Sequence, residues 1–411
     1  MVKRQLPKPT ELLELMQFKK PELNGTKRRL DSALTIADLQ KIARRRTPKA
    51  AFDYTDGAAE GELSLTRARQ AFEDIEFHPD ILRPAANVDT SVEVLGGRSA
   101  LPFGIAPTGF TRLMQTEGET AGAGAAAAAG IPFTLSTLGT TSIEDVKATN
   151  PNGRNWFQLY VMRDRDFVER LIDRAKAAGC SALVVTLDLQ ILGQRHKDIK
   201  NGLSTPPKPT LTNILDLMTK PRWCLGMMGT RRRNFGNIFG HVKGVENMGS
   251  LAEWTAKQFD PRLSWDDVAW IKKRWGGKMI LKGVQDVEDA YLARDSGADA
   301  VIVSNHGGRQ LDGAPSSISA LPAIADAVGD RIEVHMDGGI RSGQHVLKAI
   351  ALGAKGTYIG RSMLYGLGAM GEEGVDHALR IIRNELDLSM AFCGRTDIRQ
   401  VDKSILLPGS F

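Results

Sequence analysis

The segment Ala293–Gly308, ARDSGADAVIVSNHGG, contains a helical run, a glycine, a short apolar strand and a polar end. The glycine suits the left-handed position that closes a helix, and the apolar run suits a strand that is buried on both faces. Helices that alternate with such strands indicate parallel βαβ units. The same order of features recurs in three further segments: AGAAAAAGIPFTLST at 123–137, RAKAAGCSALVVTLD at 174–188 and KAIALGAKGTYIGRS at 348–362.

The number of these strands favours a closed barrel. Four more apolar runs fit between the repeats, which gives about eight strands, the number that closes a (β/α)₈ TIM barrel. A doubly wound sheet is the competing architecture, but no GxGxxG follows the first strand, and polar residues end nearly every strand rather than lining one crevice. We therefore predict an α/β fold, a TIM barrel with an N-terminal helical extension and a long insertion after the fourth strand. The four further strands are expected at Phe103–Pro107, Trp156–Tyr160, Met279–Lys282 and Ile332–Met336.

Two segments lie outside the repeating pattern. We expect a basic N-terminal segment at 1–33, followed by one barrel domain at 34–411 that contains an insertion at 204–262. The two segments carry formal charges of +4 and +5 in a chain whose net charge is +6, so the remaining framework is slightly acidic. The patterns Thr35–Asp38 and Ser264–Asp267 each resemble a capping box that opens a helix.

The insertion interleaves aromatic and apolar side chains with arginines. Such a mixture suits a peripheral, monotopic contact with an anionic membrane surface. A subunit interface and an active-site lid are equally open interpretations, because long barrel loops serve each of these purposes. The residues concerned are Trp223, Met227, Met228, Phe235 and Phe239, together with Arg222 and Arg231–Arg233.

The composition excludes several classes of protein. The 411 residues are 42% hydrophobic and 25% charged, which permits a sizeable core and argues against intrinsic disorder. Three widely separated cysteines favour a reducing compartment and argue against zinc, and no histidine spacing suggests another metal. The basic runs lack interleaved aromatic residues, so no nucleic-acid partner is expected. Since neither a secretory signal nor an apolar span is visible, we expect a cytoplasmic protein, with a peripheral position on the cytoplasmic face of the inner membrane as an open alternative.

The motif SNHGGRQLD at Ser304–Asp312 directly follows a predicted buried strand, where barrel enzymes keep their catalytic groups. The His306 imidazole can accept a proton near neutral pH, and the Arg309 guanidinium can hold a carboxylate through two hydrogen bonds. A histidine that caps a loop is the alternative, but the glycines and the arginine beside it favour a functional site. Of the other histidines, His335 is expected in the core, and four are expected to have neither partners nor a role: His78, His241, His345 and His377.

Two turns that contain glycine and arginine predict an anion site. Asp337–Gly343, DGGIRSG, follows the seventh strand and leads into a helix, and Gly360–Arg361 follows the eighth strand. In (β/α)₈ barrels these two loops and a helix N-terminus form the usual phosphate site. The sequence therefore predicts a ligand that carries a phosphate.

Other strand ends carry polar candidates that are individually weak. Lys282 ends an apolar strand, so its ammonium must enter the barrel mouth or pair with an acid such as Asp188. A cation in the mouth could stabilise the reduced anion of an electron-accepting ring. Tyr54, taken alone, is as compatible with packing as with binding. The remaining candidates at strand ends are Gln158, Tyr160, Thr186, Asp188 and Arg195.

Five motifs together resemble a known family. They are IAPTGF from Ile105, WFQLYV from Trp156, LKGV from Leu281, SNHGGRQLD from Ser304 and DGGIRSG from Asp337. In this order, over about residues 34–407, the chain resembles the FMN-dependent L-2-hydroxy-acid oxidases and dehydrogenases. That family includes glycolate oxidase, lactate oxidase, mandelate dehydrogenase and flavocytochrome b2. The long fourth loop, with PRWCLGMMG from Pro221, is most similar to the bacterial respiratory L-lactate dehydrogenases.

The resemblance implies a role for each matching residue. His306 would be the base that acts on the substrate, and Asp188 would pair with it and favour its protonated form. Lys282 would lie near the flavin N1–C2 edge and stabilise the reduced ring. The substrate would be bound by Tyr54, Tyr160, Arg195 and Arg309, with the arginines on its carboxylate and the tyrosines on its carboxylate and developing oxygen. FMN would be bound by Pro107, Thr108, Gly109, Ser136, Gln158, Thr186, Lys282, Ser304 and Asp337, with its phosphate on Gly339, Arg341, Gly360 and Arg361.

The resemblance also implies a reaction. The leading expectation is the oxidation of L-lactate to pyruvate, with electrons passed to a quinone or another membrane acceptor. The alternative is an oxidase that acts on L-lactate, mandelate or a longer 2-hydroxy acid and releases hydrogen peroxide. Leu138 stands where glycolate oxidases have tryptophan, which should open the pocket and disfavours glycolate. A non-redox binder of FMN or of a sugar phosphate is a third interpretation, and the family implies a homotetramer.

Overall fold

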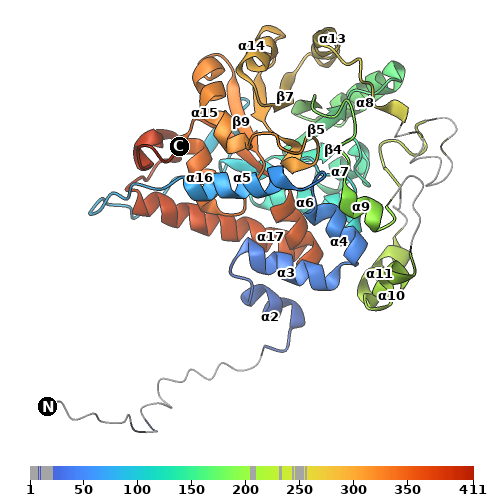
Figure 1. The fold of residues 1–411 in the computed structure, drawn as a ribbon, viewed down its shortest axis with the longest axis horizontal. Helices are drawn as coiled ribbons and strands as arrows, with labels where there is room; N and C mark the ends of the chain where they lie inside the picture. The colour runs from blue at the N-terminus through green and yellow to red at the C-terminus, as the bar shows by residue number, and fades with distance from the viewer. Residues whose placement is uncertain are drawn as a thin grey trace.

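The computed structural model describes residues 8, 10, 22–203, 210–230, 234–242, 245, 254 and 257–411. Parallel strands form a closed barrel that helices surround (Figure 1). The last strand pairs with the first, so the predicted (β/α)₈ TIM barrel is confirmed. The barrel strands are β3 (Phe103–Ile105), β4 (Phe133–Ser136), β5 (Asn155–Tyr160), β6 (Ala182–Thr186), β7 (Lys278–Val284), β8 (Ala300–Val303), β9 (Glu333–Asp337) and β10 (Gly356–Ile359).

The strands are buried on both faces because side chains fill the barrel and helices cover it. Every residue of β4, β6, β8 and β10 is buried. The glycines expected to close helices have left-handed backbones, with φ of 66° at Gly130, 73° at Gly179, 83° at Gly297 and 103° at Gly353. The helices that cover the barrel are α6 (Glu119–Ala128), α7 (Ile143–Thr149), α8 (Arg165–Ala177), α13 (Trp265–Trp275), α14 (Val287–Asp295), α15 (Ser317–Val328), α16 (Gly343–Ala351) and α17 (Arg361–Phe392).

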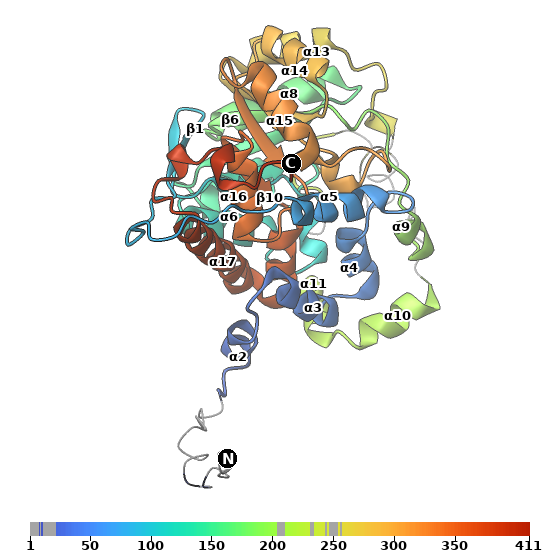
Figure 2. The same ribbon diagram turned by 60° about the vertical axis from the view of Figure 1, so that its left-hand side comes forward.

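The N-terminal part of the chain forms a helical layer against α17. Thr35 and Asp38 make the predicted capping box at the start of α3, and Ser264 and Asp267 make the corresponding one at α13. Figures 1 and 2 show α3 alongside α17, with α2 farther out. The helices are α2 (Gly25–Asp31), α3 (Ile36–Arg46), α4 (Lys49–Asp56) and α5 (Leu63–Asp74), which are followed by the antiparallel strands β1 (Val92–Val94) and β2 (Gly97–Ser99).

The insertion begins after the short helix α9 (His196–Lys200), and its described part includes α10 (Leu211–Met218) and α11 (Pro221–Gly229). Both helices lie beside the N-terminal layer (Figure 1). Asp216 accepts a hydrogen bond of 2.6 Å from the Lys49 backbone, and Lys220 donates one of 2.9 Å to the Arg45 carbonyl. The expected arginines Arg231–Arg233 lie outside the described residues.

None of the described helices is both long enough and apolar enough to span a membrane. His335 is fully buried in β9, as expected, and lies between Tyr358 and Glu333 at hydrogen-bond distances of 2.6 and 2.9 Å. The boundary between the basic N-terminal segment and the barrel domain stays a prediction.

Candidate active site

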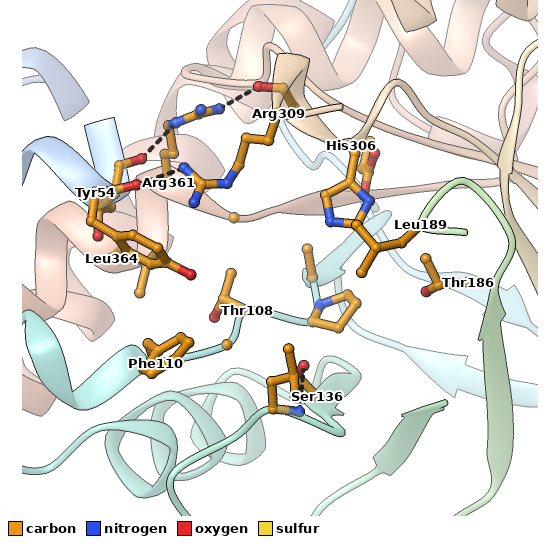
Figure 3. A pocket seen from close by; sticks show the side chains of 18 of the residues that line it. Tyr54, Thr108, Phe110, Ser136, Thr186, Leu189, His306, Arg309, Arg361 and Leu364 are labelled. Carbon is orange, nitrogen blue, oxygen red and sulfur yellow. Dashed lines mark hydrogen bonds between the residues drawn. The ribbon is translucent and has the colours of Figure 1, made fainter. Parts of the chain in front are cut away.

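A pocket of about 350 Å³ lies at the carboxyl ends of the barrel strands, where the predicted site residues meet (Figure 3). Figure 3 shows His306, Arg309 and Tyr54 around the same space as Thr108 and Ser136. The predicted residues that line the pocket are Tyr54, Pro107, Thr108, Gly109, Ser136, Tyr160, Thr186, Arg195, Lys282, His306, Arg309, Asp337, Gly339, Arg341, Gly360 and Arg361.

Three predicted residues lie behind this lining, and each supports a residue that lines the pocket. Asp188 pairs with His306, and Ser304 accepts a hydrogen bond of 2.6 Å from Lys282. Gln158 accepts from the Ser136 hydroxyl at 3.1 Å and donates to the Thr186 hydroxyl at 3.0 Å. These three side chains fix the direction of the groups that face a ligand.

The turn after β8 has an unusual backbone that places His306 at the pocket. His306, Gly307 and Gly308 have φ of 55°, 64° and 73°. A left-handed backbone is uncommon for a residue with a side chain, although histidine tolerates it better than most, and it is often found at functional sites. A Cβ on Gly308 would lie 2.9 Å from the Leu65 nitrogen, so α5 leaves room only for glycine. The Ser304 hydroxyl accepts the His306 N–H at 3.1 Å and stabilises the turn.

His306 and Asp188 form a hydrogen-bonded pair, with 2.8 Å between Nδ1 and Oδ1. Burial raises the pKa of Asp188, but the charge and hydrogen bond of His306 and the charge of Lys282 together lower it below its ordinary value. Since an ionised Asp188 accepts a hydrogen bond from the Nδ1–H of His306, the neutral imidazole carries its lone pair on Nε2. That tautomer is the one a general base requires.

Lys282 points into the barrel mouth and forms an ion pair with Asp337, with 2.9 Å between Nζ and Oδ2. The sequence suggested Asp188 as one possible partner, but the partner is the acid at the end of β9, on the other side of β8. The ammonium is buried, so the paired carboxylate offsets the cost of removing it from water. The next residue, Gly283, has φ of 108°, and a Cβ there would lie 2.7 Å from Asp188. A glycine is therefore required where β7 passes the hydrogen-bonded pair of His306 and Asp188.

The two arginines expected to bind a carboxylate flank the ring of Tyr54. The guanidinium carbons of Arg309 and Arg195 lie 4.7 and 5.5 Å from the centre of that ring. Arg309 donates to the carbonyls of Tyr54 and Gly57 at 2.6 and 3.1 Å, while Arg195 pairs with Asp198 at 2.8 Å. Burial lowers the pKa of Arg309, and the charge of Arg195 lowers it further. An anionic ligand would relieve this repulsion.

Arg341 and Arg361 bring further positive charge to the loops after β9 and β10. Arg361 donates to the carbonyls of Thr55, Gly57 and Gly307 at 2.8, 2.6 and 2.9 Å. Burial, followed by the charge of Arg309, lowers its pKa to about 9. Burial also lowers the pKa of Arg341. Such a concentration of buried guanidinium groups suits a phosphate.

The polar groups of the pocket fit FMN. Among the described residues, two buried atoms of the pocket lining have no hydrogen-bond partner: Asp337 Oδ1 and Arg341 Nε. A buried polar atom without a partner is costly, so a ligand that hydrogen-bonds to these atoms is favoured. The arginines suit the phosphate of FMN, and the amide, hydroxyl and ammonium groups of Gln158, Ser136, Thr186 and Lys282 suit its polar ring edge.

Sequence reasoning missed several supporting residues. Gln310 donates hydrogen bonds of 2.8 Å to the carbonyls of Asp188 and Ile191, and so holds the loop after β6. It belongs to the SNHGGRQLD motif, which was a usable signal. Asp198, the partner of Arg195, and Phe259 also line the pocket. Phe235 was noted among the insertion residues that could contact a membrane, a subunit or the active site, but it was not predicted to line the pocket, as it does.

The expectation that four histidines have no partner was wrong for two of them. His377 donates from Nε2 to the Ala33 carbonyl at 2.7 Å, and His345 contacts the backbone of Arg341. The Nδ1 of His345 lies 3.2 Å from the Arg341 nitrogen, from which it accepts a hydrogen bond. Its ring stacks on Phe72 with 4.3 Å between the ring centres, behind the loop of Gly339. Burial lowers the pKa of His345 to about 4, so it is neutral at pH 7 and able to accept. No spacing rule predicts such a contact.

The chain matches a family model for FMN-dependent dehydrogenases over residues 43–408. It is 50% identical to a Mycobacterium tuberculosis protein provisionally named L-lactate dehydrogenase, over 97% of this chain and 95% of that protein. It is 43% identical to the L-lactate dehydrogenase of Caulobacter vibrioides, over 90% of this chain and 97% of that protein. Among solved structures, the monotopic membrane protein (S)-mandelate dehydrogenase is 34% identical with a TM-score of 0.87, over 91% of this chain and 99% of that one.

The family model covers most of the chain and the relatives align over nearly their whole lengths. FMN is therefore the cofactor, and arginine, hydroxyl and ammonium groups line the pocket at the carboxyl ends of the strands. The chain belongs to the FMN-dependent dehydrogenase family, and its resemblance to the enzymes that oxidise L-2-hydroxy acids is confirmed.

Proposed function

We propose that the chain oxidises L-lactate to pyruvate and delivers the two electrons, by way of its FMN, to a quinone or a similar membrane acceptor. The observation that carries this proposal is the pairing of His306 with a buried Asp188 at 2.8 Å, in the same pocket as the arginines that flank Tyr54. A base and a carboxylate site in one pocket suit a 2-hydroxy acid. The names of the relatives, L-lactate dehydrogenase, support lactate within that class.

In this proposal the carboxylate of the substrate is bound by Arg309, Arg195 and Tyr54, and the Tyr160 hydroxyl contacts the oxygen at C2. Nε2 of His306 accepts the proton that the substrate loses, and the charge of Asp188 stabilises the resulting imidazolium. Burial raises the pKa of Tyr160, so its hydroxyl keeps its proton and can donate.

FMN supplies the two-electron acceptor when it is bound. Lys282 would stabilise negative charge at the flavin edge, and Asp337 and Ser304 would hold the ammonium in place. The residues that would hold the ring and its ribityl chain are Pro107, Thr108, Gly109, Ser136, Gln158, Thr186, Ser304 and Asp337. Those that would hold the phosphate are Gly339, Arg341, Gly360 and Arg361.

The test is to reduce the purified yellow protein with L-lactate in the absence of oxygen, and then to compare its reoxidation by air and by a water-miscible quinone. We expect complete bleaching and faster reoxidation by the quinone. Rapid, stoichiometric hydrogen peroxide would instead identify an oxidase. Mandelate and longer 2-hydroxy acids belong in the substrate panel, because mandelate oxidase is also a neighbour, with a TM-score of 0.77. Absence of bleaching with every L-2-hydroxy acid would leave a non-redox binder of FMN.

We propose that the insertion provides a peripheral contact with an anionic membrane, on its cytoplasmic face. On α10, Leu211, Ile214, Leu215 and Met218 are spaced as one helical face, and they are 72, 50, 56 and 75% exposed. Leu225 and Met228 of α11 are 64 and 65% exposed. An exposed apolar face on α10, beside basic residues of α3 and α11, suits a lipid surface. The similar (S)-mandelate dehydrogenase is described as monotopic.

Co-sedimentation with vesicles tests this contact. We expect binding to vesicles that contain an anionic lipid and weaker binding to neutral vesicles, because basic side chains add about 1 kcal/mol each at an anionic surface. A subunit interface predicts no vesicle binding and a change of assembly when α10 is altered, and a lid predicts a change of KM. The homotetramer that the resemblance implies would be measured by light scattering in the same preparations.

A further inference from the structure

The insertion supplies part of the wall of the substrate pocket. Phe235 and Phe259 both come from the segment 204–262, line the pocket, and are only 4 and 8% exposed. Each lies against an aromatic residue of the pocket: Phe259 packs edge-on against Tyr160 at 6.0 Å between ring centres, and Phe235 packs edge-on against Phe110 at 4.4 Å. The insertion therefore contributes residues to the pocket as well as exposed helices at the surface of the protein.

Phe235 is connected to the expected carboxylate site through one intervening ring. Phe110 packs edge-on against Tyr54 at 5.6 Å between ring centres. The Tyr54 ring in turn contacts Arg309, whose guanidinium carbon lies 4.7 Å from the centre of that ring. Edge-on ring pairs at such distances are favourable beyond the apolar area that they bury. We therefore expect a substitution of Phe235 to alter the position of the Tyr54 ring.

The backbone beside Phe235 is held against the loop after β4. Gly236 donates a hydrogen bond of 3.0 Å to the Gly139 carbonyl. A Cβ on Gly236 would lie 2.5 Å from the Ser142 nitrogen, so only glycine allows this approach. Asn237, which is fully buried, accepts the Ile143 N–H at 2.9 Å and donates to the Ser136 carbonyl at 3.3 Å. Phe235 is consequently a fixed part of the wall.

We propose that Phe235 is a positioning and specificity-determining residue: by holding Phe110 against Tyr54, it keeps the pocket narrow and selects L-2-hydroxy acids with compact side chains. The inference rests on the proposed function, in which Tyr54 and Arg309 bind the substrate carboxylate. Removing the ring leaves a cavity beside Phe110. Phe110 then moves away from Tyr54, which loosens the carboxylate site and enlarges the space for a substrate side chain.

The experiment compares Phe235→Ala, Phe235→Leu and a matched control, Phe239→Ala, with the unaltered FMN-bound protein. Phe239 lies one helical turn away, donates its N–H to the Phe235 carbonyl at 2.9 Å and is partly buried, but does not line the pocket. Steady-state assays with a water-miscible quinone as the electron acceptor give kcat and KM for L-lactate and for L-2-hydroxy-3-phenylpropanoate. Flavin content per chain reports whether each variant folds.

For Phe235→Ala we expect KM for L-lactate to rise about tenfold with a smaller change in kcat. The ratio of kcat/KM between the small and the large substrate should fall by about tenfold, the lower end of the effect of one methylene group in an apolar pocket. The ratio for Phe235→Leu should lie between those of Phe235→Ala and the unaltered protein, and Phe239→Ala should keep the ratio of the unaltered protein. If Phe235→Ala does not retain FMN, Phe235→Leu carries the test with a shift in the same direction.

An unchanged ratio in the folded Phe235 variants would overturn the proposal, and so would an equal shift in Phe239→Ala, which would indicate general loosening of the insertion. A failure of the proposed function has a different signature. If the unaltered protein bleaches with no L-2-hydroxy acid, the reaction is wrong; if Tyr54→Phe leaves every KM unchanged, the carboxylate assignment is wrong. Neither result depends on Phe235.

Discussion

The barrel and the insertion treat apolar side chains in opposite ways. The strand segment Ala182–Thr186 is buried at every position, whereas the apolar face of α10 is at least half exposed at each of its four residues. Burial of apolar area stabilises the barrel by roughly 25 cal/mol per Å², but the apolar face of α10 gains at most half of this stabilisation, since its side chains are at least half exposed. Apolar residues in the barrel therefore specify the fold, and those on α10 specify a contact that the described chain does not itself complete.

The largest effect is expected on the barrel side, at the base. His306→Asn should lower the rate of flavin bleaching by L-lactate by about 10⁴-fold, because a general base contributes up to that factor. Stopped-flow absorbance without oxygen measures this rate, and the flavin content per chain should remain that of the unaltered protein. A variant that bleaches at the original rate would show that another group removes the proton.

The second effect concerns the partner of the base. Asp188→Asn should lower the bleaching rate by about 10²-fold, since an amide can donate to Nδ1 and so stabilise the wrong tautomer. It also removes the charge that favours the imidazolium. The variant should bind FMN, because Asp188 lies behind the pocket lining. If the variant bleaches at the rate of the unaltered protein throughout pH 6 to 8, Asp188 has only a structural role.

On the insertion side, replacing Leu211, Ile214, Leu215 and Met218 by serine should leave anaerobic bleaching by L-lactate unchanged. Affinity for anionic vesicles should fall by at least about tenfold, because four apolar side chains no longer enter the interface. Co-sedimentation measures the affinity. The control is Leu292→Ser on α14, where a leucine that is 45% exposed lies far from the insertion in sequence. Equal loss of binding in the control would refute a specific role for α10.

The smallest effect is expected behind the phosphate loop. Burial lowers the pKa of His345 to about 4, while a histidine in the unfolded chain titrates near 6.5. Between these values the unfolded chain binds more protons, so stability is lost as pH falls from about 6.5 towards about 4. His345→Asn should therefore lose less of its thermal stability than the unaltered protein between pH 7 and pH 5. Calorimetry with the exposed His78→Asn as control checks this; equal losses in all three proteins would contradict it.

Local patterns were sufficient to predict the barrel and most residues at its mouth. The order helix, glycine, strand, polar end located the turns of Asp188, His306 and Arg361, because in a closed parallel barrel all carboxyl ends of strands lie at one rim. The resemblance then supplied expected roles for single residues. The family, the fold and FMN are confirmed, whereas the individual roles stay predictions.

Contacts between distant segments could not be predicted in this way. From the sequence, Lys282 could have paired with any acidic residue at a strand end. The packing of β7, β8 and β9 places Asp337 beside it. His345 was expected to have no partner because its contact is with the backbone of Arg341, which no side-chain pattern reveals. The sequence left the insertion around Phe235 open as a membrane contact, a subunit interface or a lid, since nothing in its neighbours indicates that the chain folds back to Phe110.

The sequence by itself determined the strand periodicity, the glycines that close the helices, the residues at the ends of the strands and the charge of the two added segments, because each of these depends on neighbours along the chain. The tertiary structure decided which charges pair, which arginines are buried together and which wall Phe235 completes. Those outcomes depend on distances between segments that lie up to several hundred residues apart, such as Arg309 and the Tyr54 carbonyl at 2.6 Å. Burial then fixes their energies, because the same guanidinium that is fully hydrated in an open chain loses that water in the pocket.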